Sequence, residues 1–383
     1  MNQYHEQAGG IYIHVPFCVK KCAYCDFYSC TALNQIPEYV DALIDEMNMA
    51  PAFSFHADTI YLGGGTPSLL EPTQIHRLID ATCKRFSVAS HPEITIEANP
   101  GTVNFQKLAG YRKAGVNRIN IGVQSFSDPA LEFLSRIHSS ADAICAVETA
   151  RSAGFDNIGL DLIYGLPGQN KRSWQSDLQA ATRLAPQHLS CYMLTYEPGT
   201  QMENNLINGR FRSLPDTTVG ALFELTVGYL KSEGFDQYEV SNFSTSFQTR
   251  SRHNQKYWTH APYLGFGPSA HSLMEKRRFW NVRYLEPYLH KIGQGTPPLE
   301  ETEELTRRQL LMETLYLRLR CADGISIAAF EREFNIEFRQ FFSTVIAGYE
   351  AEGILDIAGN QCRLTQKGML FADGVAARFI DVI

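Results

Sequence analysis

Short apolar runs alternate with amphipathic stretches along the first 235 residues of the chain. The apolar runs are rich in β-branched and aromatic residues, which is typical of buried strands, and the stretches between them place apolar residues at helical spacing. The predicted strands are 11–15, 59–62, 93–97, 118–123, 158–163 and 188–194, and the clearest predicted helices are 37–49, 72–85, 104–113 and 216–233. Because parallel strands need crossover connections, this order predicts an α/β fold, a partial (β/α)6 TIM-like barrel that stays open.

A different pattern begins after the polar, proline-containing connection at 293–298. Amphipathic stretches predict helices at 302–320, 327–334 and 338–352, followed by a β-hairpin at 354–364 and a last helix from residue 366. We therefore expect a barrel over residues 1–235, a barrel extension over 236–298 and a smaller, mainly helical, winged-helix-like domain over 299–383. The last domain is expected to close over the mouth of the barrel.

Composition and charge exclude several classes of protein. The 383 residues carry a net charge of −7 and no long run of Lys or Arg, so nucleic acid is not an expected partner. No stretch is apolar enough to span a membrane, and residues 1–10 lack the apolar segment of a signal peptide. We expect a cytoplasmic protein, with peripheral membrane contact left open. Five of its nine cysteines are expected to be buried, inert thiols: Cys83, Cys145, Cys191, Cys321 and Cys362.

The loop after the first predicted strand carries the strongest chemical signal. Pro16 ends the strand, and Cys18, Cys22 and Cys25 follow with three and then two residues between them. Three thiolates at this spacing can hold an iron–sulfur cluster and leave one iron open to a small molecule. Zinc binding or a redox-active thiol pair is the alternative. A closed zinc site needs a fourth ligand, however, and we expect Cys30 to be an incidental buried thiol.

Glycines and polar residues follow the predicted strands, where barrel proteins place their sites. Gly64 and Gly65 lie in a glycine triplet before Thr66, which either lets the backbone approach a ligand or forms a plain turn. Glu97 ends the third strand, and we expect it to meet a ligand because an unpaired buried acid is costly.

Three further polar residues are candidates. Gln124 either bonds a ligand or satisfies its own loop, and Arg136 either binds a carboxylate or is a solvated charge. Asp161 lies inside the apolar fifth strand. On the residues alone, both interpretations of Gln124 and Arg136 stay open.

The cysteine spacing directly after a first strand, with Tyr24 before the last cysteine, resembles the signature of the radical S-adenosylmethionine (SAM) family. The strings HVPFC and YCDF resemble the branch that contains oxygen-independent coproporphyrinogen III oxidase (HemN) and the HemW heme chaperones. The resemblance covers nearly the whole chain. It implies a partial barrel, a 4Fe-4S cluster on the three loop cysteines, and S-adenosyl-L-methionine as a second cofactor. The SAM contacts that it implies are Tyr12, Phe27, Gly64, Gly65, Thr66, Glu97, Gln124, Arg136 and Asp161.

Residues 252–258 form the other distinctive string, RHNQKYW. A histidine beside two aromatic residues is more often a packed core residue than a ligand, but imidazole is an axial ligand of heme iron and flat aromatic faces suit a porphyrin. The string HNxxYW also resembles the HemW-type branch. That resemblance implies heme as cargo, in contact with His253, Tyr257 and Trp258, and His271 is a second candidate.

Two functions from different classes remain. An oxidase would use the cluster and SAM to decarboxylate a porphyrinogen, whereas a chaperone would bind heme or porphyrin and deliver heme to apo-hemoprotein acceptors. Asp26 and Phe27 stand where the oxidase has a small residue and a further cysteine, and the oxidase has a longer amino-terminal extension. Both differences favour the chaperone, and whether the protein is an enzyme stays open. The family resemblance also implies an electron donor such as flavodoxin or ferredoxin.

Overall fold

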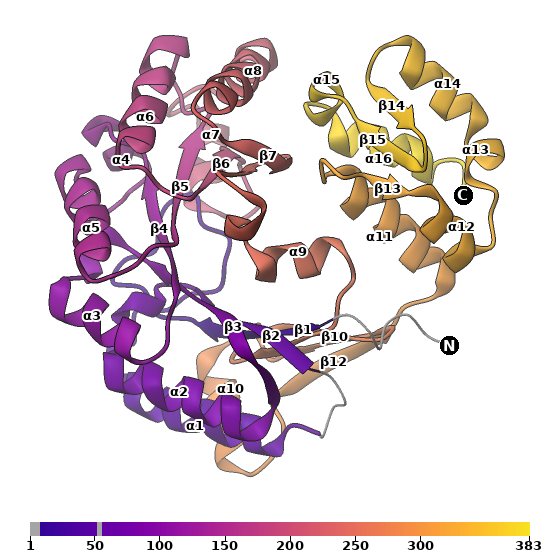
Figure 1. Cartoon of the computed structure of the whole chain (residues 1–383). Helices are drawn as coiled ribbons and strands as arrows, with labels where there is room; N and C mark the ends of the chain where they lie inside the picture. The colour runs from indigo at the N-terminus through magenta and orange to yellow at the C-terminus, as the bar shows by residue number, and fades with distance from the viewer. Residues whose placement is uncertain (1–7, 52–55) are drawn as a thin grey trace.

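Six parallel strands form the centre of a large curved sheet (Figure 1). The computed structural model describes residues 8–51 and 56–383, and in it each strand from β1 to β6 pairs in parallel with the next. These strands are β1 Gly9–Val15, β2 His56–Gly64, β3 Ser87–Ala98, β4 Arg118–Gln124, β5 Ile158–Tyr164 and β6 His188–Met193. The predicted partial barrel is confirmed. Residues 1–7, part of the segment in which we expected no signal peptide, lie outside the described residues.

Helices cover the outer face of the parallel strands (Figure 1). They are α1 Ile36–Met49, α2 Pro72–Arg85, α3 Phe105–Lys113, α4 Asp128–Phe133, α5 Ser140–Ser152, α6 Lys171–Arg183 and α8 Asp216–Ser232. Helix α2 shows how the sequence starts such a helix, because Glu71 and Gln74 form a reciprocal capping box around Pro72 and the next apolar residues, Ile75 and Leu78, are buried. The four helices predicted for this region are present, each within one residue of its predicted ends.

Strand alternation separates an apolar outer layer from a polar barrel interior. On β1, Ile11 and Ile13 are fully buried in the main hydrophobic core, whereas Tyr12 and His14 point to the opposite side and bond to each other. Neighbouring strands carry further polar residues on that side: Thr59, Tyr61, Glu97, Arg118, Asn120, Asp161 and His188. A polar ligand can therefore find partners inside the barrel.

Short strands widen the sheet at both edges. After β6 come β8 Asn242–Ser244 and β7 Asp236–Glu239, both antiparallel. Beside β1 lie β9 Tyr263–Phe266, which is parallel to it, and then β10 His271–Met274, β11 Arg277–Asn281 and β12 Leu299–Glu304. Helix α7 Gln201–Ile207 follows β6, and α10 Leu285–Gly293 packs on α1. Helix α9 Arg252–Trp258 connects the two edges and packs against β1 and β2 (Figure 1).

Strand β12 shows where the helix prediction for 302–320 was wrong. Glu303 and Glu304 pair with Arg278 and Arg277 across to β11, and α11 Arg307–Leu319 begins only after its N-cap, Thr306. Opposite charges on paired strands stabilise this arrangement. Because β12 belongs to the large sheet, we propose that the last domain starts near residue 305, whereas we had expected 299.

Helices around a small antiparallel sheet form the C-terminal domain. Its elements after α11 are β13 Ile325–Ser326, α12 Ile327–Phe334, α13 Phe338–Phe341, α14 Ser343–Ala351, β14 Leu355–Ala358, β15 Gln361–Leu364, α15 Gln366–Met369 and α16 Ala372–Ile380. Strands β14 and β15 are the predicted hairpin. The core is aromatic, with successive ring contacts that link Phe330, Phe338, Phe342 and Phe379.

The C-terminal domain joins the barrel through the end of β7. The Val240 N–H donates to the Arg320 carbonyl at 3.0 Å, and the Ala322 N–H donates to the Tyr238 carbonyl at 3.1 Å. The Arg320 guanidinium also forms an ion pair with Glu239. These contacts fix the start of the domain against the barrel.

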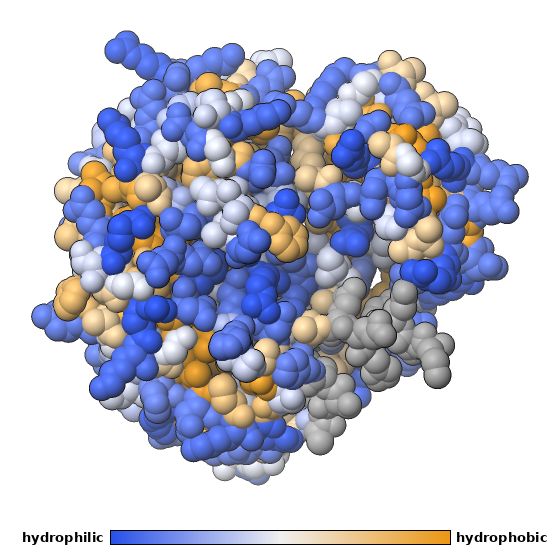
Figure 2. Space-filling view, in the orientation of Figure 1, coloured by the Kyte–Doolittle hydropathy of each residue, from blue (hydrophilic) through white to orange (hydrophobic). Residues whose placement is uncertain are grey.

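Hydrophilic residues cover most of the face in Figure 2, and apolar residues are scattered between them. Within 8–51 and 56–383, no helix has the length and apolarity needed to cross a membrane. Cys191, Cys321 and Cys362 are buried as predicted, but Cys83 and Cys145 are exposed. The prediction for these two was wrong because α2 and α5 turn other residues to the core.

Candidate functional site

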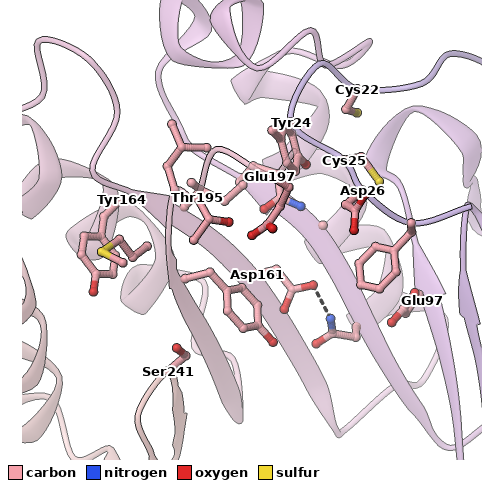
Figure 3. A pocket seen from close by; sticks show the side chains of 18 of the residues that line it. Cys22, Tyr24, Cys25, Asp26, Glu97, Asp161, Tyr164, Thr195, Glu197 and Ser241 are labelled. Carbon is pink, nitrogen blue, oxygen red and sulfur yellow. Dashed lines mark hydrogen bonds between the residues drawn. The ribbon is translucent and has the colours of Figure 1, made fainter. Parts of the chain in front are cut away.

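A cavity of about 1010 Å³ lies at the carboxyl ends of the parallel strands. The loops after β1 to β6 line one part of it, and the C-terminal domain closes it with Arg320 and residues 369–374. The expected contribution of this domain to the barrel mouth is therefore present. Figure 3 shows Cys22, Cys25 and Asp26 on one side of the cavity, Tyr164 and Ser241 on the other, and Asp161 between them.

The cysteine loop is closed at its base by backbone hydrogen bonds. The Cys18 N–H donates to the Cys30 carbonyl at 2.9 Å, and the Cys30 N–H donates to the Pro16 carbonyl at 2.7 Å. This closed base turns Cys18, Cys22 and Cys25 toward the cavity, which all three line. Cys30 is half-buried and contributes its backbone to the loop, and it is not among the lining residues.

Two polar side chains contact the thiols. The Thr66 hydroxyl donates to Sγ of Cys18 at 3.4 Å, and Nη1 of Arg136 donates to Sγ of Cys22 at 3.5 Å. Nη2 of Arg136 also donates to the Gly122 carbonyl, which fixes the guanidinium. Burial raises the pKa of Cys18 and raises the pKa of Cys25 to about 11. These thiols hold protons at neutral pH, and metal binding must displace them.

The three cysteines provide the thiol ligands that an iron–sulfur cluster takes. They are unpaired and share one cavity. In the described part of the chain, no three His, Cys, Asp or Glu side chains are grouped closely enough to hold one metal ion. Their role as cluster ligands stays a prediction.

Glu97 is a half-buried carboxylate near the end of β3 that lines the cavity. The Tyr61 hydroxyl donates to its Oε1 at 2.7 Å, and the Gly64 N–H donates to its Oε2 at 3.1 Å. Burial raises the pKa of Glu97 to about 7, which these two hydrogen bonds offset in part. A ligand cation placed beside Glu97 would favour the ionised form and gain binding energy from it.

The glycine triplet fits its own surroundings tightly. A Cβ on Gly64, where φ is +109°, would lie 2.6 Å from the His14 ring, and one on Gly65 would lie 2.7 Å from the Phe17 carbonyl oxygen. Both glycines and Thr66 line the cavity. Packing against β1 therefore requires these glycines before any ligand is considered.

The remaining predicted SAM residues lie in the same cavity, with one exception. Phe27, Gln124, Arg136 and Asp161 line it. Nδ2 of Asn120 donates to Oδ2 of Asp161 at 2.5 Å (Figure 3), and burial raises the pKa of Asp161.

Tyr12 is the exception. It lies deeper, stacks on Tyr61 and His253, and is not a lining residue. The structure thus brings eight of the nine predicted contacts to one cavity, and their role in SAM binding stays a prediction.

The three predicted heme residues are not in this cavity. His253 is 1% exposed, with Nδ1 2.8 Å from Oγ1 of Thr59 and Nε2 2.9 Å from the Tyr257 hydroxyl. Burial lowers the pKa of His253 to about 3, so the imidazole is neutral. Trp258 packs on Tyr238. The heme contact of these residues stays a prediction, although both ring nitrogens of His253 are occupied in this structure.

His271 is exposed on β10, stacks on Trp280 and also lies outside the cavity lining. Sequence reasoning missed much of the real lining: Tyr164, Tyr192, Met193, Thr195, Glu197, Phe223, Ser241, Arg320 and residues 369–374. Tyr164, Tyr192 and Met193 stand at the carboxyl ends of β5 and β6, so the rule that singled out Glu97 applied to them too. Arg320 and residues 369–374 follow no predicted barrel strand, so no sequence rule indicated that they line the cavity.

Comparisons with known proteins agree with this architecture. Residues 12–181 match the Radical SAM superfamily and residues 305–371 match the HemN C-terminal domain. The chain is 34% identical over 373 residues to heme chaperone HemW of Bacillus subtilis, covering 96% of this chain and 98% of that protein. It is 41% identical over 266 residues to heme chaperone HemW of Escherichia coli, covering 68% and 69%. Coproporphyrinogen III oxidase (HemN) from Escherichia coli has the same fold, with a TM-score of 0.85 at 24% identity, covering 100% of this chain and 92% of that chain.

Proposed function

The chain belongs to the HemW family of the radical SAM superfamily, and we propose that it is a heme chaperone that carries a 4Fe-4S cluster and SAM and delivers heme to apo-hemoproteins. The observation that carries the proposal is the meeting of three unpaired cysteines with Glu97 and Arg136 in one cavity. That set offers thiolates to a cluster and charged partners to an amino acid.

Cys18, Cys22 and Cys25 would hold the cluster, which when reduced supplies single electrons. The other lining residues would bind and orient SAM. Glu97 suits its ammonium group, the Arg136 guanidinium suits its carboxylate, and Asp161 suits the hydroxyl groups of its ribose. The Gly64 N–H and the Tyr61 hydroxyl hold Glu97 in place. An electron donor such as flavodoxin or ferredoxin is the partner that the cluster would need.

Oxygen-independent coproporphyrinogen oxidation is the second candidate, because HemN shares the fold. The residues after Cys25 favour the chaperone. Asp26 and Phe27 line the cavity at the place where the oxidase is expected to have a further cysteine, so this chain offers no additional thiol there.

The two candidates are separated by parallel assays on anaerobically reconstituted protein. One sample is titrated with hemin, and another receives coproporphyrinogen, SAM and a reductant. The chaperone proposal expects stoichiometric heme binding without protoporphyrinogen. Steady production of protoporphyrinogen would establish the oxidase instead.

A further inference from the structure

Half of the cavity has no assigned ligand. The cysteines and the predicted SAM residues line one side, and the other side lies between the ends of β5 and β6, helix α8 and the turn that joins α15 to α16. The total volume of about 1010 Å³ is at the upper end of the range for single-ligand pockets, about 300–1,000 Å³. We call the unassigned side, lined by Tyr164, Tyr192, Met193, Phe223, Arg320 and residues 369–374, the far half.

Large apolar side chains of the far half are open to the cavity. Met193 is 48% exposed, Tyr192 41% and Phe371 50%, and all three line it. Tyr192 combines this accessible ring with a strongly raised pKa, caused mainly by burial. A side chain that faces a deep cavity shows this combination, because solvent reaches the ring while protein surrounds it. Exposed apolar surface of this kind gains free energy when a flat apolar ligand covers it.

The turn that closes the far half is held in place. Oδ1 of Asp373 pairs with Arg320 at 3.1 Å, and Leu370 packs against Gly220 of α8. Phe371 lies between these two contacts, on the turn that lines the cavity. The far half thus has accessible apolar residues from the barrel, Tyr192 and Met193, and from the C-terminal domain, Phe371.

The far half also contains a suitable iron ligand. Among the described residues that line the cavity there is no histidine, and the phenol of Tyr192 holds its proton firmly. The thioether of Met193 is the accessible soft donor, and thioethers ligate heme iron in other proteins. Met369 also lines the cavity, but it is buried.

From these observations we propose that the far half holds the porphyrin ring of heme, between Met193 and Phe371, with the Met193 sulfur as an iron ligand. This inference rests on the proposed heme binding and gives the heme a site other than helix α9.

If heme binds in the far half, His253 has a structural role. One of its hydrogen bonds joins α9 to Thr59 of β2, the other holds Tyr257 within α9, and neither partner lines the cavity. A change at His253 should therefore act on stability, and a change at Met193 or Phe371 should act on heme affinity.

The test titrates hemin into the reconstituted full-length protein and follows the iron by magnetic circular dichroism and electron paramagnetic resonance. Met193→Ala and Phe371→Asp are each expected to raise the dissociation constant by about 5-fold or more, the loss of one buried apolar contact. Met193→His should restore binding and replace the wild-type iron signal with that of an imidazole-ligated heme. Circular dichroism of the same samples checks that each variant is folded.

Control variants place the same changes outside the cavity. Ile207→Ala and Phe247→Asp alter exposed apolar residues that are not cavity-lining and should leave hemin affinity unchanged. His253→Gln should lower the unfolding temperature and keep the wild-type iron signal. The inference is overturned if hemin binds normally to both Met193→Ala and Phe371→Asp, or if His253→Gln removes the iron signal from folded protein. If wild-type protein binds no hemin, the proposed function itself fails.

Discussion

Arg320 lies 3.0 Å from Glu239, and this ion pair ties the C-terminal domain to the end of β7. Glu239 is only 2% exposed, so its carboxylate depends on the guanidinium and on hydrogen bonds from the Ser241 N–H and Nδ2 of Asn242.

Replacing Arg320 should therefore destabilise the protein strongly. Arg320→Ala leaves the charge of Glu239 buried and uncompensated, which costs about 3–5 kcal/mol of unfolding free energy. Arg363→Ala is the matched control, because Arg363 pairs with Asp356 at the surface and should cost about 0–1 kcal/mol. Urea unfolding followed by circular dichroism measures both. Similar losses in the two variants would show that the Arg320–Glu239 pair is not a structural tie.

The cluster should depend on three cysteines and not on the fourth. Ala at Cys18, Cys22 or Cys25 removes a lining thiol, so each variant should lose nearly all cluster iron and visible absorption after reconstitution. Cys30→Ala should retain the cluster, because Cys30 supplies backbone hydrogen bonds to the loop and these survive the change. Iron analysis checks each variant. Loss of the cluster in Cys30→Ala would show that Cys30 is a fourth ligand.

Glu97 should make stability fall with rising pH. Its pKa is about 7 in the folded protein against 4.5 in an unfolded chain, so the folded state binds the extra proton between these values. This contribution to the unfolding free energy is complete below pH 4.5 and is lost as pH rises through 7, a change of about 3 kcal/mol. Glu97→Gln removes it, and the difference between the two proteins isolates it from other titrating groups.

The measurement is the unfolding free energy of both proteins from pH 5 to pH 8 without SAM. The wild type should lose stability relative to Glu97→Gln over this range. A difference that stays constant would mean that Glu97 is already ionised in the folded apoprotein.

Gly64 should be intolerant of any side chain. Gly64→Ala combines a left-handed backbone with a Cβ placed 2.6 Å from His14, whereas Gly154→Ala has a similar φ of +89° and meets nothing within 4 Å. Gly154→Ala, the control, should lower the unfolding free energy by about 1–2 kcal/mol, and Gly64→Ala should lower it by more. Thermal unfolding of the apoproteins compares them. Equal losses of stability in the two variants would show that the whole effect comes from the left-handed backbone and none from the contact with His14.

Local patterns predicted the barrel well because each strand and helix carries its own periodicity. The cysteine loop and Glu97 could also be placed, since they follow strands whose ends must meet at one edge. Strand β12 was missed because LEETEE has no apolar period and two of its glutamates pair with arginines on β11. The far half was missed because Arg320 and Phe371 reach the cavity only after a separate domain has packed on the barrel. No sequence pattern near Arg320 or Phe371 indicates the contact between the C-terminal domain and the barrel.

The hydrogen bond between Thr59 and His253 joins residues 194 positions apart, and β1 pairs with β9 from the same late region. While the ribosome is still making the middle of the chain, the edge of β1 that later pairs with β9 is unpaired. Its sequence, IYIHV, is mainly apolar, and the barrel interior is unfilled. Nascent chains stalled near residue 235 should remain sensitive to protease, and those that have released residue 266 should become resistant. The first strand is therefore open to aggregation during synthesis until β9 has emerged and paired with it.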